Sequence, residues 1–234
     1  MRKLMIIGNG MLAKAFESFH KRTYNYIIFA SGVSNSNETS FENFNREKEL
    51  LLEVLEQYKD KTIVYFSSCS IYDSSLTNSL YVYHKMCMER LVRENSKNYL
   101  IARLPQVIGK TYSPTIVNFL FNKIKNRECF SIFGKAHRNF IDVDDVVKVT
   151  NYLLKEGLFI NSIVNLASTH HTSMYELILY LEKISNQRAF YNVENKGSRY
   201  FIDVSILQDV YQKLGIKFDK DYVEKVINKY YAIK

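Results

Sequence analysis

The stretch Lys3-Leu-Met-Ile-Ile-Gly-Asn-Gly-Met-Leu-Ala13 contains the pattern that decides the fold. Its apolar first half is typical of a short buried strand, and residues 11–21 have the periodicity of a helix. Gly8 permits a tight turn, Gly10 lets another group approach the backbone, and the small Ala13 lets strand and helix pack closely. A helix that begins at such a turn offers unpaired N–H groups and the positive end of its dipole to an anion. The stretch therefore predicts a phosphate-binding unit of the kind found in dinucleotide sites.

The chain that follows continues to alternate short apolar runs with helical periodicity. We expect strands at residues 26–30, 62–67 and 99–104 and helices at residues 41–58 and 81–94. Strands that alternate with helices form a parallel sheet that is covered by helices on both faces. The sequence therefore predicts an α/β fold with a Rossmann-like parallel sheet.

The second half of the chain is less regular. We expect helices at residues 115–126, from Asp145 onward and at 173–184, strands at 130–133, 139–143 and 163–166, and a tail with one short strand and two amphipathic helices. Asp144 is the expected N-cap of the middle helix, and Ser173 with Glu176 forms a capping box. We interpret residues 1–112 plus about 140–168 as a dinucleotide-binding domain, and residues of about 113–139 plus 169–234 as a small α/β substrate-binding lobe at the carboxyl ends of the sheet.

The composition of the 234 residues excludes several classes of protein. Three cysteines without CxxC spacing argue against a disulfide framework and a zinc site, and they favour a reducing compartment. The net charge of +8 is scattered, so a phosphate-bearing small molecule is a better partner than nucleic acid. The apolar runs are too short to span a membrane. We expect a cytoplasmic protein that binds no nucleic acid, no membrane and no metal.

A second motif, Tyr81-Val-Tyr-His-Lys85, places a phenol and an ammonium one turn apart on a helix. This spacing alone is weak, but a strand that ends in Ser67-Ser68-Cys69-Ser70 lies just upstream. A lysine beside a tyrosine favours the phenolate, and a serine hydroxyl can hydrogen-bond a substrate oxygen. Ser68, Tyr81 and Lys85 are therefore candidates for a proton-transfer site.

These motifs, in this order, resemble those of the extended short-chain dehydrogenase/reductase family, the NAD(P)-dependent epimerases, dehydratases and reductases of nucleotide sugars. Phe66-Ser-Ser-Cys-Ser-Ile-Tyr72 resembles the serine-rich strand end of that family, and Tyr81 to Lys85 with Glu89 resembles its catalytic helix. Arg103-Leu-Pro-Gln-Val-Ile-Gly109 is similar to its RxPxVxG segment, and Gly134 through Arg138-Asn-Phe-Ile-Asp-Val-Asp-Asp145 to its G…RDFIHVDD stretch. The resemblance covers nearly the whole chain.

The resemblance implies a role for each site residue. The implied catalytic residues are Tyr81, Lys85 and Ser68. The implied cofactor contacts are Gly8, Asn9, Gly10, Met11, Leu12, Ala30, Ser31, Gly32, Ser67, Tyr81, Lys85, Pro105 and Val107. The implied substrate contacts are Ser68, Cys69, Arg138, Lys196 and Arg199, with Arg138 at a diphosphate. The cofactor is NAD or NADP, unresolved but with a slight lean to NADP, the substrate is a nucleotide sugar, and the expected assembly is a homodimer through helices 41–58 and 81–94.

The chain departs from the family pattern in two places. Only residues 22–25 separate the first helix from the next strand, so we expect the usual second and third strands to be missing, together with the acid that binds the adenosine ribose. Cys69 and Ser70 stand where dehydratases carry an Asp-Glu pair, and no histidine matches that of an epimerising reductase. Three hypotheses remain: a 4-keto-sugar reductase for surface polysaccharide synthesis, a nucleotide-sugar 4-epimerase, or a non-catalytic binding member. A trimmed adenosine site fits cofactor exchange, which favours the reductase.

Overall fold

A five-stranded parallel sheet forms the centre of the computed structural model, which describes residues 5–19 and 25–232. Its strands are β1 (Met5–Ile7), β2 (Tyr26–Phe29), β3 (Thr62–Ser68), β4 (Asn98–Leu104) and β8 (Ser162–Asn165), in the order β1-β2-β3-β4-β8. The register is parallel throughout, with Ile7 opposite Phe29 and Ser68 opposite Leu104. The predicted Rossmann-like parallel sheet is confirmed. The first two residues of the expected first strand and the end of the first helix lie outside the described residues.

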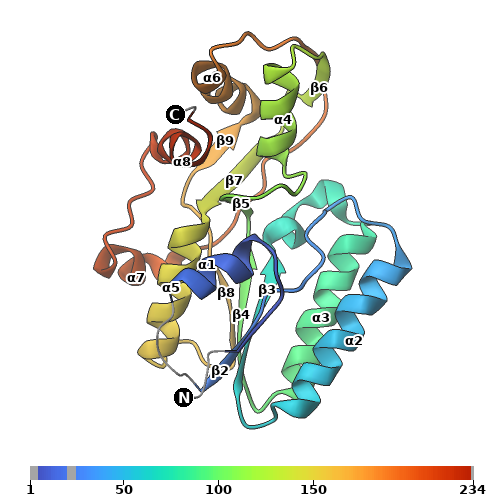
Figure 1. The fold of residues 1–234 in the computed structure, drawn as a ribbon, viewed down its shortest axis with the longest axis vertical. Helices are drawn as coiled ribbons and strands as arrows, with labels where there is room; N and C mark the ends of the chain where they lie inside the picture. Colours follow the sequence, from blue (N-terminus) through green and yellow to red (C-terminus); the bar gives the residue numbers. More distant parts are fainter. Residues whose placement is uncertain (1–4, 20–24, 233–234) are drawn as a thin grey trace.

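Helices cover both faces of this sheet (Figure 1). The helices α1 (Met11–Phe19) and α5 (Val143–Lys155) contact each other on one face, while α2 (Phe41–Gln57) and α3 (Leu80–Asn95) form a pair on the other. Successive residues of β3 face these two layers, because side chains of a strand alternate in direction. Val64 belongs to the same buried cluster as Phe16 of α1, and Tyr65 belongs to the cluster of Leu51. The sheet is therefore buried on both sides, as its continuous apolar runs predict.

The strand β1 lies at the edge of the sheet and pairs directly with β2. Among the described residues, no strand lies beyond β1. The chain between α1 and β2 is too short for two strands with connecting helices, so the expected loss of two strands on this side agrees with the topology. Also within the described residues, no helix has both the length and the apolar character needed to cross a membrane.

A second group of elements lies at the carboxyl ends of the sheet strands (Figure 1). It contains β5 (Gln106–Ile108), α4 (Ile116–Lys125), β6 (Phe130–Phe133), β7 (His137–Asp142), β9 (His171–Ser173), α6 (Met174–Ser185), β10 (Tyr191–Glu194) and α8 (Tyr222–Tyr231). They form a three-stranded sheet, β5-β7-β9, and a parallel pair, β10-β6. The helix α7 (Gln208–Lys213) lies instead near the end of β8, where the Tyr211 hydroxyl donates a hydrogen bond to the Ala167 carbonyl at 2.9 Å. The sequence-based division places the whole of residues 169–234, this helix included, in the substrate-binding lobe, and it stays a prediction.

The helix starts agree with the sequence at most positions. Ser40 and Ser79 cap α2 and α3, and Ser173 and Glu176 form the expected capping box of α6. The expected N-cap of α5 was wrong, because Asp142 caps this helix and its Oδ1 accepts the N–H of Asp144 at 3.0 Å. Asp142 also accepts hydrogen bonds from Lys229 and Tyr230 on α8. One carboxylate therefore fixes the start of α5 and the position of the last helix together.

Candidate active site

A cavity opens where the carboxyl ends of the sheet strands meet the second group of elements. Most of the residues predicted for the cofactor or for catalysis line it: Gly10, Met11, Leu12, Ala30, Gly32, Ser67, Ser68, Tyr81, Lys85, Pro105 and Val107. Sequence reasoning missed six further lining residues that carry hydroxyl groups: Ser34, Ser36, Thr111, Ser113, Thr115 and Tyr200. The signal for the first two was the polar loop after β2, at a strand end where parallel sheets bind ligands.

Four predicted residues lie around the cavity without lining it. Gly8 forms the turn beneath it, where the backbone of β1 meets Ala30. Asn9 and Ser31 are the neighbours of Gly10 and Gly32 in the lining loops. Cys69 is fully buried, and its thiol donates a hydrogen bond to the Arg103 carbonyl at 3.3 Å. Burial raises the pKa of the Cys69 thiol well above its ordinary value, so the structure places an inert thiol behind Ser68 rather than a substrate contact.

The three predicted cationic substrate contacts have different surroundings. Arg138, on β7, is mostly buried and lies 3.9 Å from the carboxylate of the buried Asp73. It is also close enough to Tyr200, a lining residue, for its charge to act on that phenol. Lys196 is exposed and pairs with Glu194, and Arg199 is exposed. None of the three lines the cavity, but Arg138 lies near the lining residue Tyr200, whereas Lys196 and Arg199 lie at the surface.

Ser68 and Tyr81 approach the cavity from two different elements. Ser68 is the last residue of β3, and its Oγ accepts the N–H of Ser70 at 3.1 Å, which leaves its own O–H free to donate. Tyr81 lies in the first turn of α3, which the side chain of Ser79 caps. Because Lys85 follows one turn later, both side chains face the carboxyl end of β3. The Lys85 Nζ lies 5.9 Å from the centre of the Tyr81 ring.

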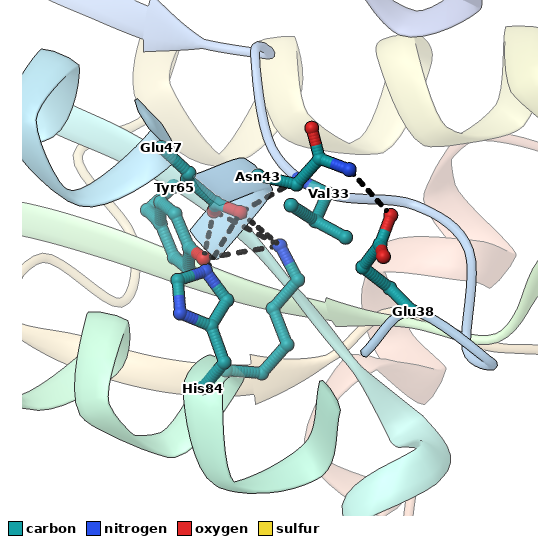
Figure 2. A network of polar contacts seen from close by, with 7 residues as sticks. Val33, Glu38, Asn43, Glu47, Tyr65 and His84 are labelled. Atoms are coloured by element: carbon teal, nitrogen blue, oxygen red, sulfur yellow. Dashed lines mark hydrogen bonds and ion pairs between the residues drawn. The ribbon is translucent and has the colours of Figure 1, made fainter. Parts of the chain in front are cut away.

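A buried carboxylate, Glu47 of α2, holds Lys85 in this position. Figure 2 shows Glu47 beside Tyr65 and His84. Lys85 Nζ donates to Glu47 Oε1 at 3.0 Å and to the Tyr65 hydroxyl at 3.2 Å. Glu47 also accepts hydrogen bonds from the Tyr65 hydroxyl at 2.6 Å and the Val33 N–H at 2.6 Å, and it contacts His84 Nε2 at 2.9 Å. Burial alone would raise the pKa of Glu47, but the Lys85 charge and these hydrogen bonds lower it to about 2.

Sequence reasoning did not identify Glu47, although a signal was present. Leu51, Val54 and Leu55 form the inward stripe of α2, and Glu47 lies one turn before Leu51 on that stripe. An acidic residue on the apolar face of a helix needs a buried partner, because an unpaired buried charge costs several kcal/mol. The partner could not be inferred from the sequence, since Lys85 lies on another helix.

Two features of the cavity fit a bound dinucleotide: open space over a helix N-terminus and a polar group without a partner. Gly10 lies at the start of α1, and a Cβ built there meets no atom within 4 Å, so the glycine leaves open space over the helix N-terminus. The Ser67 Oγ is buried and, among the described residues, has no hydrogen-bond partner. It therefore offers an unused polar group in the cavity wall. No cluster of metal-ligating side chains occurs in residues 5–19 and 25–232, and the cavity lining there includes no carboxylate.

The sequence from residue 8 to residue 167 matches the NAD dependent epimerase/dehydratase family. The chain belongs to this family. The family's description gives its members as dependent on NAD. No curated protein matches the sequence significantly.

Solved structures confirm the fold at low sequence identity. RMD from Pseudomonas aeruginosa, in complex with NADPH, has a TM-score of 0.71 and 17% identity, over 97% of both chains. The UDP-N-acetylglucosamine 4-epimerase of Methanobrevibacter ruminantium, in complex with UDP-N-acetylmuramic acid, has a TM-score of 0.69 and 19% identity, over 92% of this chain and 77% of that chain. The UDP-glucose 4-epimerase of Thermus thermophilus, in complex with NAD, has a TM-score of 0.67 and 14% identity, over 92% of this chain and 79% of that chain.

Proposed function

We propose that this chain is an NAD(P)-dependent oxidoreductase that reduces the 4-keto group of a sugar linked to a nucleotide. The observation that carries the proposal is the meeting of Ser68, Tyr81 and Lys85 at one cavity, beside a glycine turn that opens a helix. Each of the three supplies a group that carbonyl reduction needs: a hydrogen-bond donor, an acid and a cation. Their retention together argues against the non-catalytic alternative.

The proposed roles follow from the side chains. A reduced nicotinamide supplies a hydride to the carbonyl carbon when it is bound. The free O–H of Ser68 holds the carbonyl oxygen by a hydrogen bond and orients it toward Tyr81. Tyr81 donates its phenolic proton to that oxygen as negative charge develops on it, and the ammonium of Lys85 stabilises the phenolate that remains. The product is an alcohol, and Tyr81 regains a proton from solvent.

A nucleotide-linked sugar is the proposed substrate because the cation Arg138 lies near the lining residue Tyr200. Arg138 does not line the cavity, but its charge acts on the lining residue Tyr200, and guanidinium groups bind diphosphates through paired hydrogen bonds. The structural neighbour from Methanobrevibacter ruminantium is a complex with a UDP-linked sugar, which is consistent with this assignment. Lys196 and Arg199 remain proposed substrate contacts, although both side chains are exposed at the surface.

Reduction is favoured over epimerisation by the edge position of β1. A reductase must exchange its dinucleotide after each turnover, whereas an epimerase keeps the same molecule through a complete cycle. Because no described strand lies beyond β1, the adenosine half of the dinucleotide would make fewer contacts with the protein, which favours exchange of the cofactor. A nucleotide-sugar 4-epimerase with the same three residues is the alternative, and 4-epimerases occur among the structural neighbours.

We expect NADH and NADPH to bind with dissociation constants within about threefold of each other. The acid that selects NAD, or an arginine that selects NADP, is carried in dinucleotide-binding folds by a strand on the outer side of β1, and among the described residues no strand lies on that side. Titrating each reduced cofactor with protein, and following nicotinamide fluorescence, measures both constants. No saturable binding of either cofactor would contradict the proposed function and favour the non-catalytic alternative.

The same preparation separates reductase from epimerase. Denaturing the purified protein should release no stoichiometric dinucleotide, and added NADPH should be oxidised when 4-keto-sugar nucleotides are supplied. Stoichiometric release of NAD would instead establish the epimerase alternative.

We also propose that α2 and α3 pair with a second copy of this chain. Their outer faces expose Phe41 at 69%, Tyr83 at 70% and Met86 at 51%, and a shallow apolar hollow lies between the two helices. Sedimentation should therefore give a dimer, and replacing Phe41 and Tyr83 with Asp should give a monomer. The matched control is Phe201→Asp, since Phe201 is equally exposed but lies in the tail. A native protein that sediments as a monomer would contradict this assembly.

A further inference from the structure

The cluster around Glu47 contains two tyrosines, Tyr65 and Tyr81, in addition to the ion pair between Glu47 and Lys85. Two tyrosine rings lie beside the Lys85 ammonium, at 5.3 Å for Tyr65 and 5.9 Å for Tyr81. Tyr65 is fully buried, and burial together with Glu47 raises the pKa of its phenol well above the ordinary value. Tyr65 is therefore a fixed hydrogen-bond donor. Of the two phenols, that of Tyr81 lines the cavity and can exchange a proton with a substrate.

Glu47 joins the elements that build the cavity. It extends from α2 and contacts the Val33 N–H in the loop after β2, Tyr65 on β3, and both His84 and Lys85 on α3. The chain is packed tightly at this point, because a Cβ at Gly32 would lie 2.7 Å from Lys85 Nζ and 2.9 Å from Glu47 Oε1. The carboxylate thus fixes the ammonium against the cavity wall.

The charges around Lys85 come from few groups. Its side chain is 3% exposed, and within the described part of the chain Glu47 is the only carboxylate in ion-pair contact with it. From β3 it faces the neutral Tyr65, from α3 it lies beside Tyr81, and from the loop after β2 it lies close to Gly32. His84 contacts the other carboxylate oxygen. Without Glu47, the Lys85 charge would be buried with no counter-charge, a state that favours loss of its proton.

We propose that Glu47 is a positioning residue that keeps Lys85 charged and fixed beside Tyr81, and so sets the upper pH limit at which this site can bind its cofactor and donate a proton. The part of this proposal that concerns cofactor binding and proton donation rests on the proposed oxidoreductase function. The control of the Lys85 charge by Glu47 is a property of the chain itself.

The first test therefore uses the protein without cofactor. Trace acetic anhydride acetylates only neutral amines, so the extent of Lys85 acetylation against pH, measured by mass spectrometry of its peptide, reports the charge of Lys85. In Glu47→Gln we expect the midpoint of this curve to fall by about one pH unit. Glu47→Asp, which keeps the charge on a shorter side chain, should restore most of the difference. An unchanged midpoint in Glu47→Gln would overturn the proposal.

The matched control is Glu89→Gln. Glu89 is also a buried carboxylate next to the site, but its partner is Arg103, with bonds of 2.8 and 2.7 Å, and it does not contact Lys85. Its replacement should leave the Lys85 curve in place, whereas a purely structural effect of losing a buried ion pair would move both variants alike. Equal shifts in Glu89→Gln and Glu47→Gln would therefore overturn the proposal.

Two further measurements keep the outcome decisive. If circular dichroism shows that Glu47→Gln does not fold, Tyr65→Phe takes its place. This change removes one hydrogen bond from Glu47 and one from Lys85, so the acetylation curve should shift in the same direction by a smaller amount. No shift in Tyr65→Phe would overturn the proposal. NADPH titrations from pH 6 to pH 10 should show the loss of binding moving to lower pH in Glu47→Gln. A native protein that binds no NADPH at any pH contradicts the proposed function, while the acetylation curves still decide the role of Glu47.

Discussion

Replacing Tyr81 with Phe is expected to lower turnover by about 10³-fold, since a positioned general acid contributes about 10²- to 10⁴-fold. The change removes one hydroxyl and keeps the ring that packs with Val33 and Phe44. Among the described residues, no hydrogen bond within the chain uses the Tyr81 hydroxyl. The free energy of unfolding should therefore change by less than about 1 kcal/mol. Steady-state kinetics and urea denaturation measure the two effects separately.

The matched control for Tyr81 is on the same helix. Tyr83 lies two residues further along α3, is 70% exposed and faces away from the cavity. Tyr83→Phe removes the same hydroxyl from the outer face and should keep full turnover. Turnover of Tyr81→Phe within about threefold of the native protein would remove Tyr81 from the mechanism. Equal losses in both variants would point to a disturbed helix rather than a lost acid.

The sheet could be predicted from the sequence because its strands are buried on both faces and its helices carry regular apolar stripes. The run Thr62–Ser68 and the stripe of α2 around Leu51 and Leu55 are signals of this kind. The position of α7 could not be predicted in the same way. Its place near the end of β8 depends on contacts distant in sequence, such as the hydrogen bond between Tyr211 and Ala167.

The site was predictable to the extent that its residues are near one another in sequence. The turn at Gly10 and the pair Tyr81 and Lys85 are local patterns with local geometry. Glu47 and Asp142 are different, because each acts through partners far along the chain. The partner of Glu47 on α3 and the partners of Asp142 on α8 come within reach only after the elements have packed. Short-range spacing carries no information about such contacts.

The two glycines of the first turn should respond oppositely to replacement by alanine. Gly8 has a φ of +130°, and a Cβ there would lie 2.4 Å from the Ala30 carbonyl oxygen. Gly8→Ala should therefore cost about 3 kcal/mol of unfolding free energy, from backbone strain and from separating β1 and β2. Gly10→Ala meets no atom within 4 Å and should change the unfolding free energy by less than about 1 kcal/mol.

Gly10→Ala, which should change stability less than Gly8→Ala, should have the larger effect on the affinity for cofactor. The methyl group of Gly10→Ala would occupy the open space over the start of α1. The proposed function places the phosphates of the dinucleotide there, at the backbone N–H groups. The dissociation constant for NADPH should therefore rise at least about tenfold. Urea denaturation and nicotinamide fluorescence measure the two quantities on the same preparations. Native affinity in Gly10→Ala would mean that the phosphates lie elsewhere. The proposed oxidoreductase function requires this glycine turn to place a nicotinamide beside Tyr81, so it would then lose its geometric basis even if NADPH still bound.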